Sequence, residues 1–334
     1  TQSPSLKLRD FKLLIIATFF GSVTRGENVV LGWLVLEMTD SPLMVGLAMG
    51  IRQAPALLLG ITAGTISDLI DRRKLMRMLT TLSVLTALMV GFLLTSGRAQ
   101  LWHLLLIPAL SGTIDMMFNT TKQSFVFDLV GRENGLNGMS YLGLAMRAGG
   151  MLGALAVGLA LAKWGSGSGY FVIAGGCCLS LGLLYLIRSP GRSAPANTGS
   201  MLSAFKEFWE ELKNNSTVLA LVFVVMLVEF FGFTPNALML SIARDVWDLG
   251  PGGLGILNAF NSGGGIVAIL LLALVGQIRY QGLAFIVVLH LFGGALVLLA
   301  FAPSVYVATV SYTHLRAHET EAALVCRRLL EKKR

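Results

Sequence analysis

The sequence predicts an all-α membrane protein folded as a helical bundle. Between residues 11 and 303, stretches of roughly twenty apolar residues alternate with short polar connectors, and a helix of about that length crosses about 30 Å of hydrocarbon. Apolar residues form 54% of the chain and charged residues only 13%, against about 25% charged in soluble domains. No stretch shows the alternation of apolar and polar residues that is typical of a barrel strand. A backbone in lipid must also satisfy its hydrogen bonds internally, so the spans are expected to be helices.

The expected spans include small residues that allow close helix packing. The spans cover residues 11–36, 43–67, 76–97, 101–126, 136–161, 169–188, 217–241, 252–276 and 283–302. Glycines let helix backbones approach each other where water supplies no driving force. We therefore expect Gly149 and Gly153 to be packing residues, and Gly26 to soften the first helix. Cys177 and Cys178 fall inside a span, so they indicate packing rather than a disulfide framework.

Basic residues lie in the connectors rather than in one patch. The net charge of +8 therefore indicates membrane orientation and not nucleic-acid binding. Three segments carry most of these residues: Lys7, Arg9 and Lys12; Arg72, Arg73, Lys74 and Arg77; and Arg188, Arg192, Lys206 and Lys213. Because all three segments fall on one side of the predicted topology, the positive-inside rule places the N-terminus in the cytoplasm.

The chain divides at one long connector. Residues 1–188 form a six-helix half, and residues 189–216 a cytoplasmic linker rich in Pro, Gly and Ser. The linker runs into an amphipathic segment, residues 201–212, which we expect to be a helix in the membrane plane. Residues 217–310 then supply a partial C-terminal half.

Residues 311–334 do not continue the pattern. The string that starts at Val310 resembles translated sequencing-adapter DNA, so we expect a non-native tail that overwrites a tenth span begun near Ser304. An authentic cytosolic tail is the alternative. His314 and His318 stand four apart in it, which on a helix is only half a metal site. We expect no metal and no cofactor.

The connector between the second and third spans is charged and short. It carries Gly64, Asp68, Asp71, Arg72, Arg73 and Lys74. This string resembles the signature of the major facilitator superfamily, and six spans before a long basic linker fit that family as well. The resemblance covers about residues 8–300 and implies two six-helix halves that rock about a central site. The chain supplies about nine helices where the family has twelve.

Within that family, the chain most resembles bacterial drug and siderophore exporters of the enterobactin-exporter type. The resemblance lies in residues 32–35, 71–75 and 132–153. Leu69 stands where a basic residue is usual, and Asp71 where Gly is usual. Gly150 follows Gly149 where antiporters often carry proline.

The resemblance gives the charged connector a gating role. It implies that Asp68, at the inner end of the second helix, pairs with basic residues or a helix N-terminus of the opposite half while the transporter is open outward. The alternative is an ordinary positive-inside loop. Carboxylates among the bases favour the latch, because orientation alone does not need them.

Ionisable residues deep inside the spans are expensive and normally face a cavity or a partner. They are Arg25, Glu27, Arg52, Asp115, Arg147 and Glu229. Glu27 lies about 24 Å from the start of the first span, and Arg52 about 13 Å from the outer start of the second. The two depths coincide, so we expect the two residues to pair, and Asp115 and Arg147 share a depth likewise. The six form a proton- and substrate-responsive network or, alternatively, buried pairs that only fix packing.

These observations predict a secondary active transporter, and not an enzyme, that exports a small amphipathic drug- or siderophore-like compound by alternating access, coupled to protons. A lysophospholipid flippase of the same superfamily is the alternative. A membrane-embedded transferase needs clustered acids or histidines, whereas His103 and His290 stand alone; a membrane sensor is a third class. No Walker-type loop is present. The resemblance implies a monomer in the bacterial inner membrane, with protons, a small-molecule substrate and the lipid bilayer as its partners.

Overall fold

The structure is a computed structural model in which two compact units are distinguished. It describes residues 8–131, 133–191, 206, 209–210, 212–275, 281–301, 307, 309–311 and 313. The first unit comprises Thr1–Thr198 and Leu249–Ile256, and the second comprises Gly199–Asp248 and Leu257–Arg334. All regular structure in the described residues is helical, which confirms the predicted fold class.

The helices of the first unit coincide with the six predicted N-terminal spans. They are α1 (Arg9–Gly21), η2 (Ser22–Gly26), α2 (Glu27–Thr39), α3 (Pro42–Leu69), α4 (Arg72–Thr95), α5 (Leu101–Val130), α6 (Gly135–Trp164) and α7 (Ser166–Leu186). The segments α1, η2 and α2 together make the first span. Within the described residues, six helical stretches are long and apolar enough to cross a membrane, all of them in this unit.

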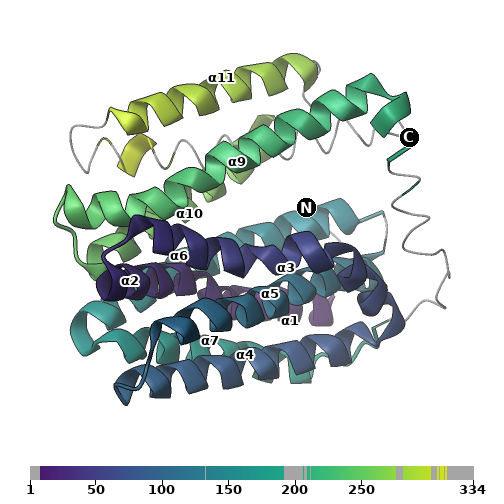
Figure 1. Ribbon diagram of the computed structural model, residues 1–334. Helices are drawn as coiled ribbons and strands as arrows, with labels where there is room; N and C mark the ends of the chain where they lie inside the picture. The colour runs from purple at the N-terminus through teal and green to yellow at the C-terminus, as the bar shows by residue number, and fades with distance from the viewer. Residues whose placement is uncertain are drawn as a thin grey trace. The chain divides into compact units, whose positions relative to one another are not determined.

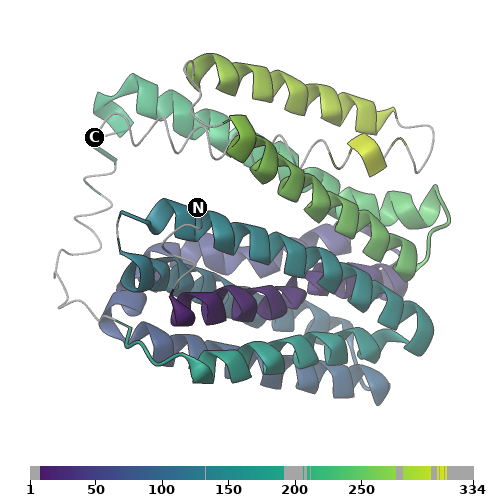
Figure 2. The same ribbon diagram turned by 180° about the vertical axis from the view of Figure 1, so that it is seen from behind.

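The helices of this unit run side by side. In Figure 1, α4 lies along α7 and α3 lies along α5, and each pair is in contact. Figure 2 shows α1 from behind, between α6 and α7, both of which it contacts. The buried core between these helices is made by apolar side chains such as Phe11, Leu14, Phe125 and Leu184. The bundle therefore holds its interior by apolar packing around α1.

Two predicted packing glycines bring α6 onto the first span. A Cβ placed on Gly149 would collide with the carbonyl oxygen of Phe19, and one placed on Gly153 would lie 2.7 Å from Cα of Val23. Both distances are too short for a real side chain, so only glycine permits this approach. Gly149 and Gly153, the two residues predicted to serve in packing, both lie at this approach.

The connector between α3 and α4 is shorter than the sequence indicates. We predicted that residues 64–74 form a polar connector, but α3 continues to Leu69 and α4 begins at Arg72. The physical reason is the side chain of Asp71, whose Oδ1 accepts a hydrogen bond from the backbone N–H of Lys74 at 3.0 Å. This N-cap starts the helix immediately, so the basic run is the first turn of α4.

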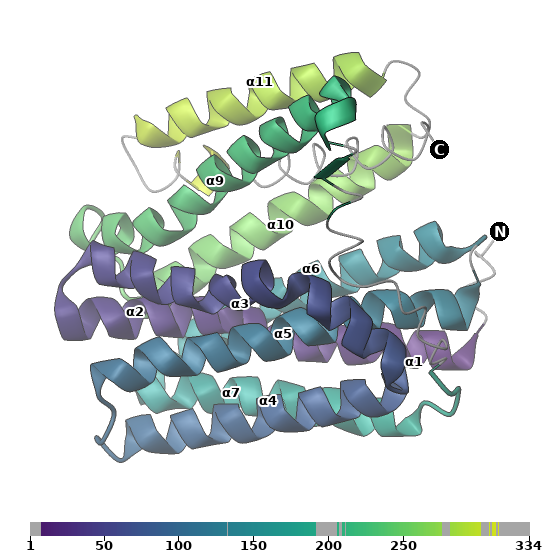
Figure 3. The same ribbon diagram turned by 45° about the vertical axis from the view of Figure 1, so that its right-hand side comes forward.

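The three further predicted spans are also helices, and they belong to the second unit except for the start of α10, which belongs to the first. They are α9 (Ser216–Asp245), α10 (Pro251–Val275) and α11 (Gln281–Ala300), and each is labelled in Figure 3. The helix α9 begins at an asparagine cap, where Oδ1 of Asn215 accepts from the backbone N–H of Val218 at 3.3 Å. Most of the predicted linker and in-plane segment, and the residues after 313, lie outside the described residues.

Candidate functional site

The first span is interrupted at mid-depth, next to the predicted soft point at Gly26. The interruption is the 3₁₀ turn η2, which separates two α-helices. On the turn, Oγ of Ser22 donates to the carbonyl of Thr18 at 2.6 Å, a local bond that competes with the regular helix. The break makes Glu27 the first residue of α2. Its carboxylate therefore lies at a helix N-terminus inside the bundle, where the helix dipole favours negative charge.

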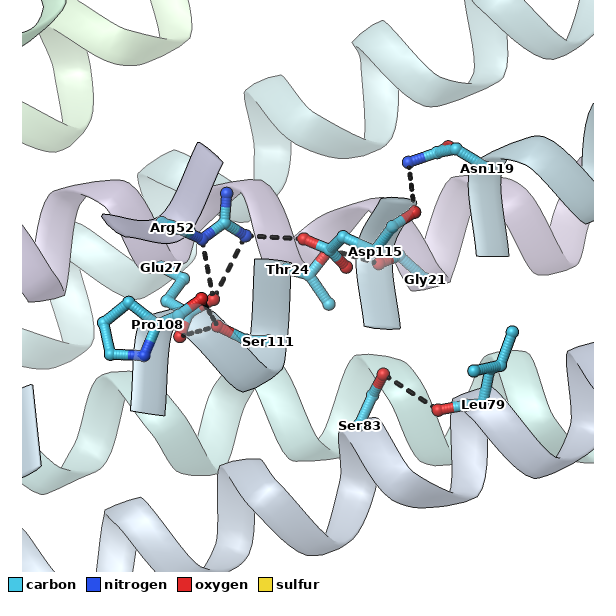
Figure 4. A network of polar contacts seen from close by, with 10 residues as sticks. All are labelled: Gly21, Thr24, Glu27, Arg52, Leu79, Ser83, Pro108, Ser111, Asp115 and Asn119. Carbon is cyan, nitrogen blue, oxygen red and sulfur yellow. Dashed lines mark hydrogen bonds and ion pairs between the residues drawn. The ribbon is translucent and has the colours of Figure 1, made fainter. Parts of the chain in front are cut away.

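Glu27 and Arg52 form the ion pair that their depths predict. Nε and Nη2 of Arg52 donate to Oε2 of Glu27 at 3.3 Å and 3.1 Å. The same Nη2 donates to Oδ2 of Asp115 at 2.5 Å, and Oγ of Ser111 donates to Oε1 of Glu27 at 3.1 Å. Figure 4 shows the guanidinium between the two carboxylates. We call Glu27, Arg52 and Asp115 the carboxylate–arginine cluster.

The cluster is buried unequally. The side chains of Arg52 and Glu27 are 10% and 6% exposed, whereas that of Asp115 is 30% exposed. Desolvation offsets most of the attraction inside such a pair, but removal of one partner leaves a buried charge that costs about 3–5 kcal/mol. Asp115 is therefore the member that solvent reaches most easily. Its depth also matches that of Arg147, but the partner the structure gives it here is Arg52.

A close crossing of α3 and α5 sets the height of the guanidinium. A Cβ on Gly112 of α5 would collide with the backbone carbonyl of Arg52 on α3. Gly112 stands next to Ser111 and almost one turn before Asp115, so the crossing places Arg52 level with both. The geometry of the cluster thus depends on a residue without a side chain.

Polar residues continue from the cluster along one face of α5. Ser111, Asp115, Asn119 and Lys122 are spaced four, four and three residues apart, which places them on one helix face. Nδ2 of Asn119 donates to the backbone carbonyl of Asp115 at 2.8 Å, as Figure 4 shows. Oδ1 of Asn119 accepts from Nζ of Lys122 at 2.9 Å. Lys122 is only 4% exposed.

Lys122 was not among the buried charged residues predicted from the sequence. The signal was present, because the lysine lies within the predicted span 101–126 and continues the helical spacing from Asp115. A polar residue at every third or fourth position of a membrane helix indicates a face turned away from lipid.

A small cavity of about 20 Å³ adjoins the cluster. Glu27, Ser111 and Asp115 line one side of it, and Thr86 of α4 and Tyr170 of α7 lie among the residues that close it. A space of this size accommodates one water molecule, and the carboxylates and hydroxyls among its lining residues can bond to it. The site can therefore hold a proton carrier next to both carboxylates without opening the bundle.

The other predicted charged residues lie around this site or outside the described side chains. Arg25 lies in the last turn of η2 and is exposed, and its Cδ would lie 2.7 Å from a Cβ placed on Gly150 of α6. Arg147 lies on α6 and is partly exposed. Glu229 lies on α9, and its side chain is outside the part of the chain that the structure describes.

The residues of the charged connector bond within the first unit. Nη1 of Arg72 donates to both carboxylate oxygens of Asp128 on α5 at 2.8 Å. Nη1 of Arg73 donates to the backbone carbonyl of Arg188 at 2.7 Å. Gly64 lies on α3, where a Cβ would meet no atom within 4 Å, and the side chain of Asp68 lies outside the described part. The latch to the opposite half stays a prediction.

Arg77 joins the start of α4 to the end of α7, a contact that the sequence did not indicate. Its Nε donates to the carbonyl of Leu184 at 3.1 Å, and its Nη2 donates to that of Ile187 at 3.0 Å. The carbonyl of Leu184 is in the last turn of α7 and that of Ile187 follows the helix directly, so neither has a partner within the helix. The connector and the end of α7 are thus held as one rigid piece.

Within the described residues, no group of three or more His, Cys, Asp or Glu side chains is placed to hold a metal ion. The carboxylate–arginine cluster itself offers proton binding at two carboxylates and ion pairing at a shared guanidinium.

Comparison with known proteins assigns the fold to a transporter family. The sequence profile described as Major Facilitator Superfamily matches residues 13–315, and no curated protein sequence matches the chain. A bacterial homologue of the human lysosomal transporter Spinster, inward-facing and unoccupied, shares 16% identity at a TM-score of 0.70 over 98% of this chain and 76% of that one. A variant of the nucleoside transporter NupG shares 11% identity at 0.77, over 98% and 84%. The xylose transporter XylE from E. coli, partially occluded and inward-open, shares 16% at 0.65, over 97% and 87%.

Proposed function

Since the chain belongs to the major facilitator superfamily, and is therefore a secondary transporter that works by alternating access rather than an enzyme, we propose that it exports a small amphipathic compound in exchange for protons. The observation that carries the proposal is the sharing of one guanidinium by a buried carboxylate, Glu27, and a partly buried one, Asp115. Such a cluster holds one negative charge more than positive charge when both acids are ionised. A single proton balances it.

The proposed coupling step takes place at Asp115. This carboxylate is the more exposed of the two, so a proton from the aqueous side reaches it first. Once protonated, it no longer attracts Arg52, and the guanidinium pairs with Glu27 alone. Because Arg52 lies on α3 while Glu27 starts α2 and Asp115 lies on α5, the change alters how three helices are held together. A difference of that kind is what lets proton binding favour one state of the transporter over the other.

The connector between α3 and α4 supports a gating role in the same cycle. The bonds of Arg72 and Arg73 fix this connector to α5 and to the end of α7, so we infer that it moves with the first half as one body. In this proposal, Asp68 near the end of α3 is the residue that pairs with the opposite half. We also propose that the N-terminus is cytoplasmic, in the inner membrane of a bacterium, and that the transporter is a monomer. An Arg73→Cys variant on a cysteine-free background tests the orientation, because a membrane-impermeant thiol reagent should label it only from the cytoplasmic side.

The coupling is tested with proteoliposomes and three dansyl compounds of matched size: dansyl-aminohexanoic acid, its uncharged amide, and the cationic dansylcadaverine. We expect an imposed pH gradient to drive accumulation of at least one of them. In a Glu27→Gln/Asp115→Asn variant, the gradient should no longer drive accumulation, although passive exchange of the same compound continues. Glu37→Gln serves as the control, because Glu37 is an exposed carboxylate near the far end of α2.

Two results would overturn the proposal. Full gradient-driven accumulation by the doubly substituted variant would show that the carboxylate–arginine cluster is not needed for proton coupling. The protein would be a flippase and not the proposed exporter if it moved a fluorescent lysophospholipid between leaflets and transported none of the three dansyl compounds.

A further inference from the structure

Lys122 is a buried amine whose contacting neighbours are all neutral. Its Nζ donates to Oδ1 of Asn119 at 2.9 Å and lies 3.7 Å from Sδ of Met146. The same atom stands 5.4 Å from the centre of the Phe118 ring. Among the described residues it has no carboxylate within ion-pair distance. The side chain of Lys122 is 4% exposed. A charged ammonium in this place therefore carries the free-energy cost of desolvation without the counter-charge that buried ions normally have.

The nearest charged groups do not compensate for this cost. Arg25 of η2 and Asp115 of α5 are the two whose fields reach Lys122. Arg25 has the same sign as the lysine, and Asp115 is already bonded to Arg52 at 2.5 Å. Arg25 and Lys122, which lie on different helical segments, repel each other, at a cost that grows as the local dielectric constant falls.

The charge inside the first unit is also unbalanced. The ionisable side chains near the middle of the described spans of this unit are Arg25, Arg52, Lys122 and Arg147 on one hand, and Glu27 and Asp115 on the other. Basic groups thus outnumber acidic groups in the interior of the spans. Lys122 is a buried member of this set that has no carboxylate in contact among the described residues, and a buried cation of that kind favours the binding of an anion.

The position of Lys122 suits a ligand that enters from the inner side. The lysine lies eight residues, about 12 Å, before the end of α5, whereas Asp115 lies about 22 Å before the same helix end. This end of α5 carries Asp128 and faces the charged connector. Phe118 and Met146 beside the amine supply an apolar wall, so an oxyanion and an apolar chain both find a partner here.

We propose that Lys122, with Arg25, binds the negatively charged group of the transported compound, so that the substrate is an anionic amphiphile with a carboxylate or another compact oxyanion. The inference rests on the proposed transport function and gives its substrate class. Binding exchanges the amide oxygen of Asn119 for the ligand oxyanion at Nζ, which has three donor positions. The ion pair so formed supplies the counter-charge that the lysine lacks.

The test compares the charged and neutral dansyl compounds. For the unmodified transporter, we expect dansyl-aminohexanoic acid to bind and move with a KM at least about tenfold lower than that of its amide, as for a charge-assisted hydrogen bond. Lys122→Met should abolish this preference, so that the KM values of the acid and the amide fall within about twofold of each other. Lys122→Arg should keep the preference. Lys163→Met is the matched control, because Lys163 is an exposed lysine in the last turn of α6.

A preference for the anion that survives in Lys122→Met, or an equal loss of transport for all three compounds in that variant, would overturn the inference. If Lys122→Met does not fold, Arg25→Gln takes its place, because Arg25 is exposed and its substitution leaves no cavity; the same loss of preference is expected. Binding of the three compounds to detergent-solubilised protein, followed by dansyl fluorescence, separates the two proposals. Selective binding without transport contradicts the export function alone, whereas equal binding of acid and amide contradicts the anion site alone.

Discussion

Removal of the shared guanidinium is the sharpest perturbation of the site. In Arg52→Met, a side chain of similar length keeps the packing of α3 but leaves Glu27 and Asp115 facing each other without their cation. Loss of one partner of a buried pair costs about 3–5 kcal/mol. Glu27 is 6% exposed and contributes fully, whereas Asp115 is 30% exposed and is partly compensated by solvent. We therefore expect the lower part of that range, about 3–4 kcal/mol, or a fall in Tm on the order of 5–10 °C.

The assay is thermal unfolding of the purified protein in detergent, with a cycle of variants. The triple variant Glu27→Gln/Arg52→Met/Asp115→Asn buries no charge and should regain at least about half of the lost stability, because a buried ion pair adds little net stability over neutral groups. Arg98→Met, at an exposed connector residue, should change stability by less than about 0.5 kcal/mol. A Tm for Arg52→Met within about 2 °C of the unmodified protein, or a triple variant no more stable than Arg52→Met, would refute the reasoning.

Three further predictions concern helix contacts. Gly112→Ala should lower stability by about 1–3 kcal/mol, because its methyl collides with the α3 backbone, whereas Gly50→Ala, with open space around it, should be neutral in the same thermal assay. Asp71→Ala should cost about 1 kcal/mol through loss of the α4 cap; Asp71→Asn retains the cap, and equal melting of the two would contradict this role. Arg77→Met should expose the end of α7 to faster amide hydrogen exchange, since the capping bonds to its carbonyls are lost; unchanged exchange there would show that the contact is dispensable.

The helices were predictable because span length and apolar content are local properties of the sequence. Depth along the span also predicted the partner of Glu27, since rise per residue fixes how far along a span each residue lies. Depth gives height in the membrane but not the direction a side chain takes around its helix. For that reason, depth along the span placed Asp115 at the height of Arg147, whereas in the structure Asp115 bonds to Arg52. The crossing of α3 and α5 at Gly112 brings Arg52 close to it.

Three other features were not predicted from the sequence, each for a different reason. The start of α4 was placed too late because the apolar run begins at Leu75, whereas the helix begins where Asp71 caps it. Lys122 was overlooked because a single lysine does not interrupt the hydropathy of a 30-residue helix. Its significance depends on its distance to other charges, and the linear sequence does not contain that distance. The contacts of Arg77 with the end of α7 join residues more than one hundred positions apart and had no local signal.

The most direct measurement records proton and dye movement together, in proteoliposomes that contain a trapped pH indicator and are supplied with the transported dansyl compound. The unmodified transporter should move protons in fixed proportion to dye, and Glu27→Gln/Asp115→Asn should move dye with no proton flux above that of empty vesicles. Equal proton-to-dye ratios in the two proteins would mean that the carboxylate–arginine cluster does not carry the coupling proton.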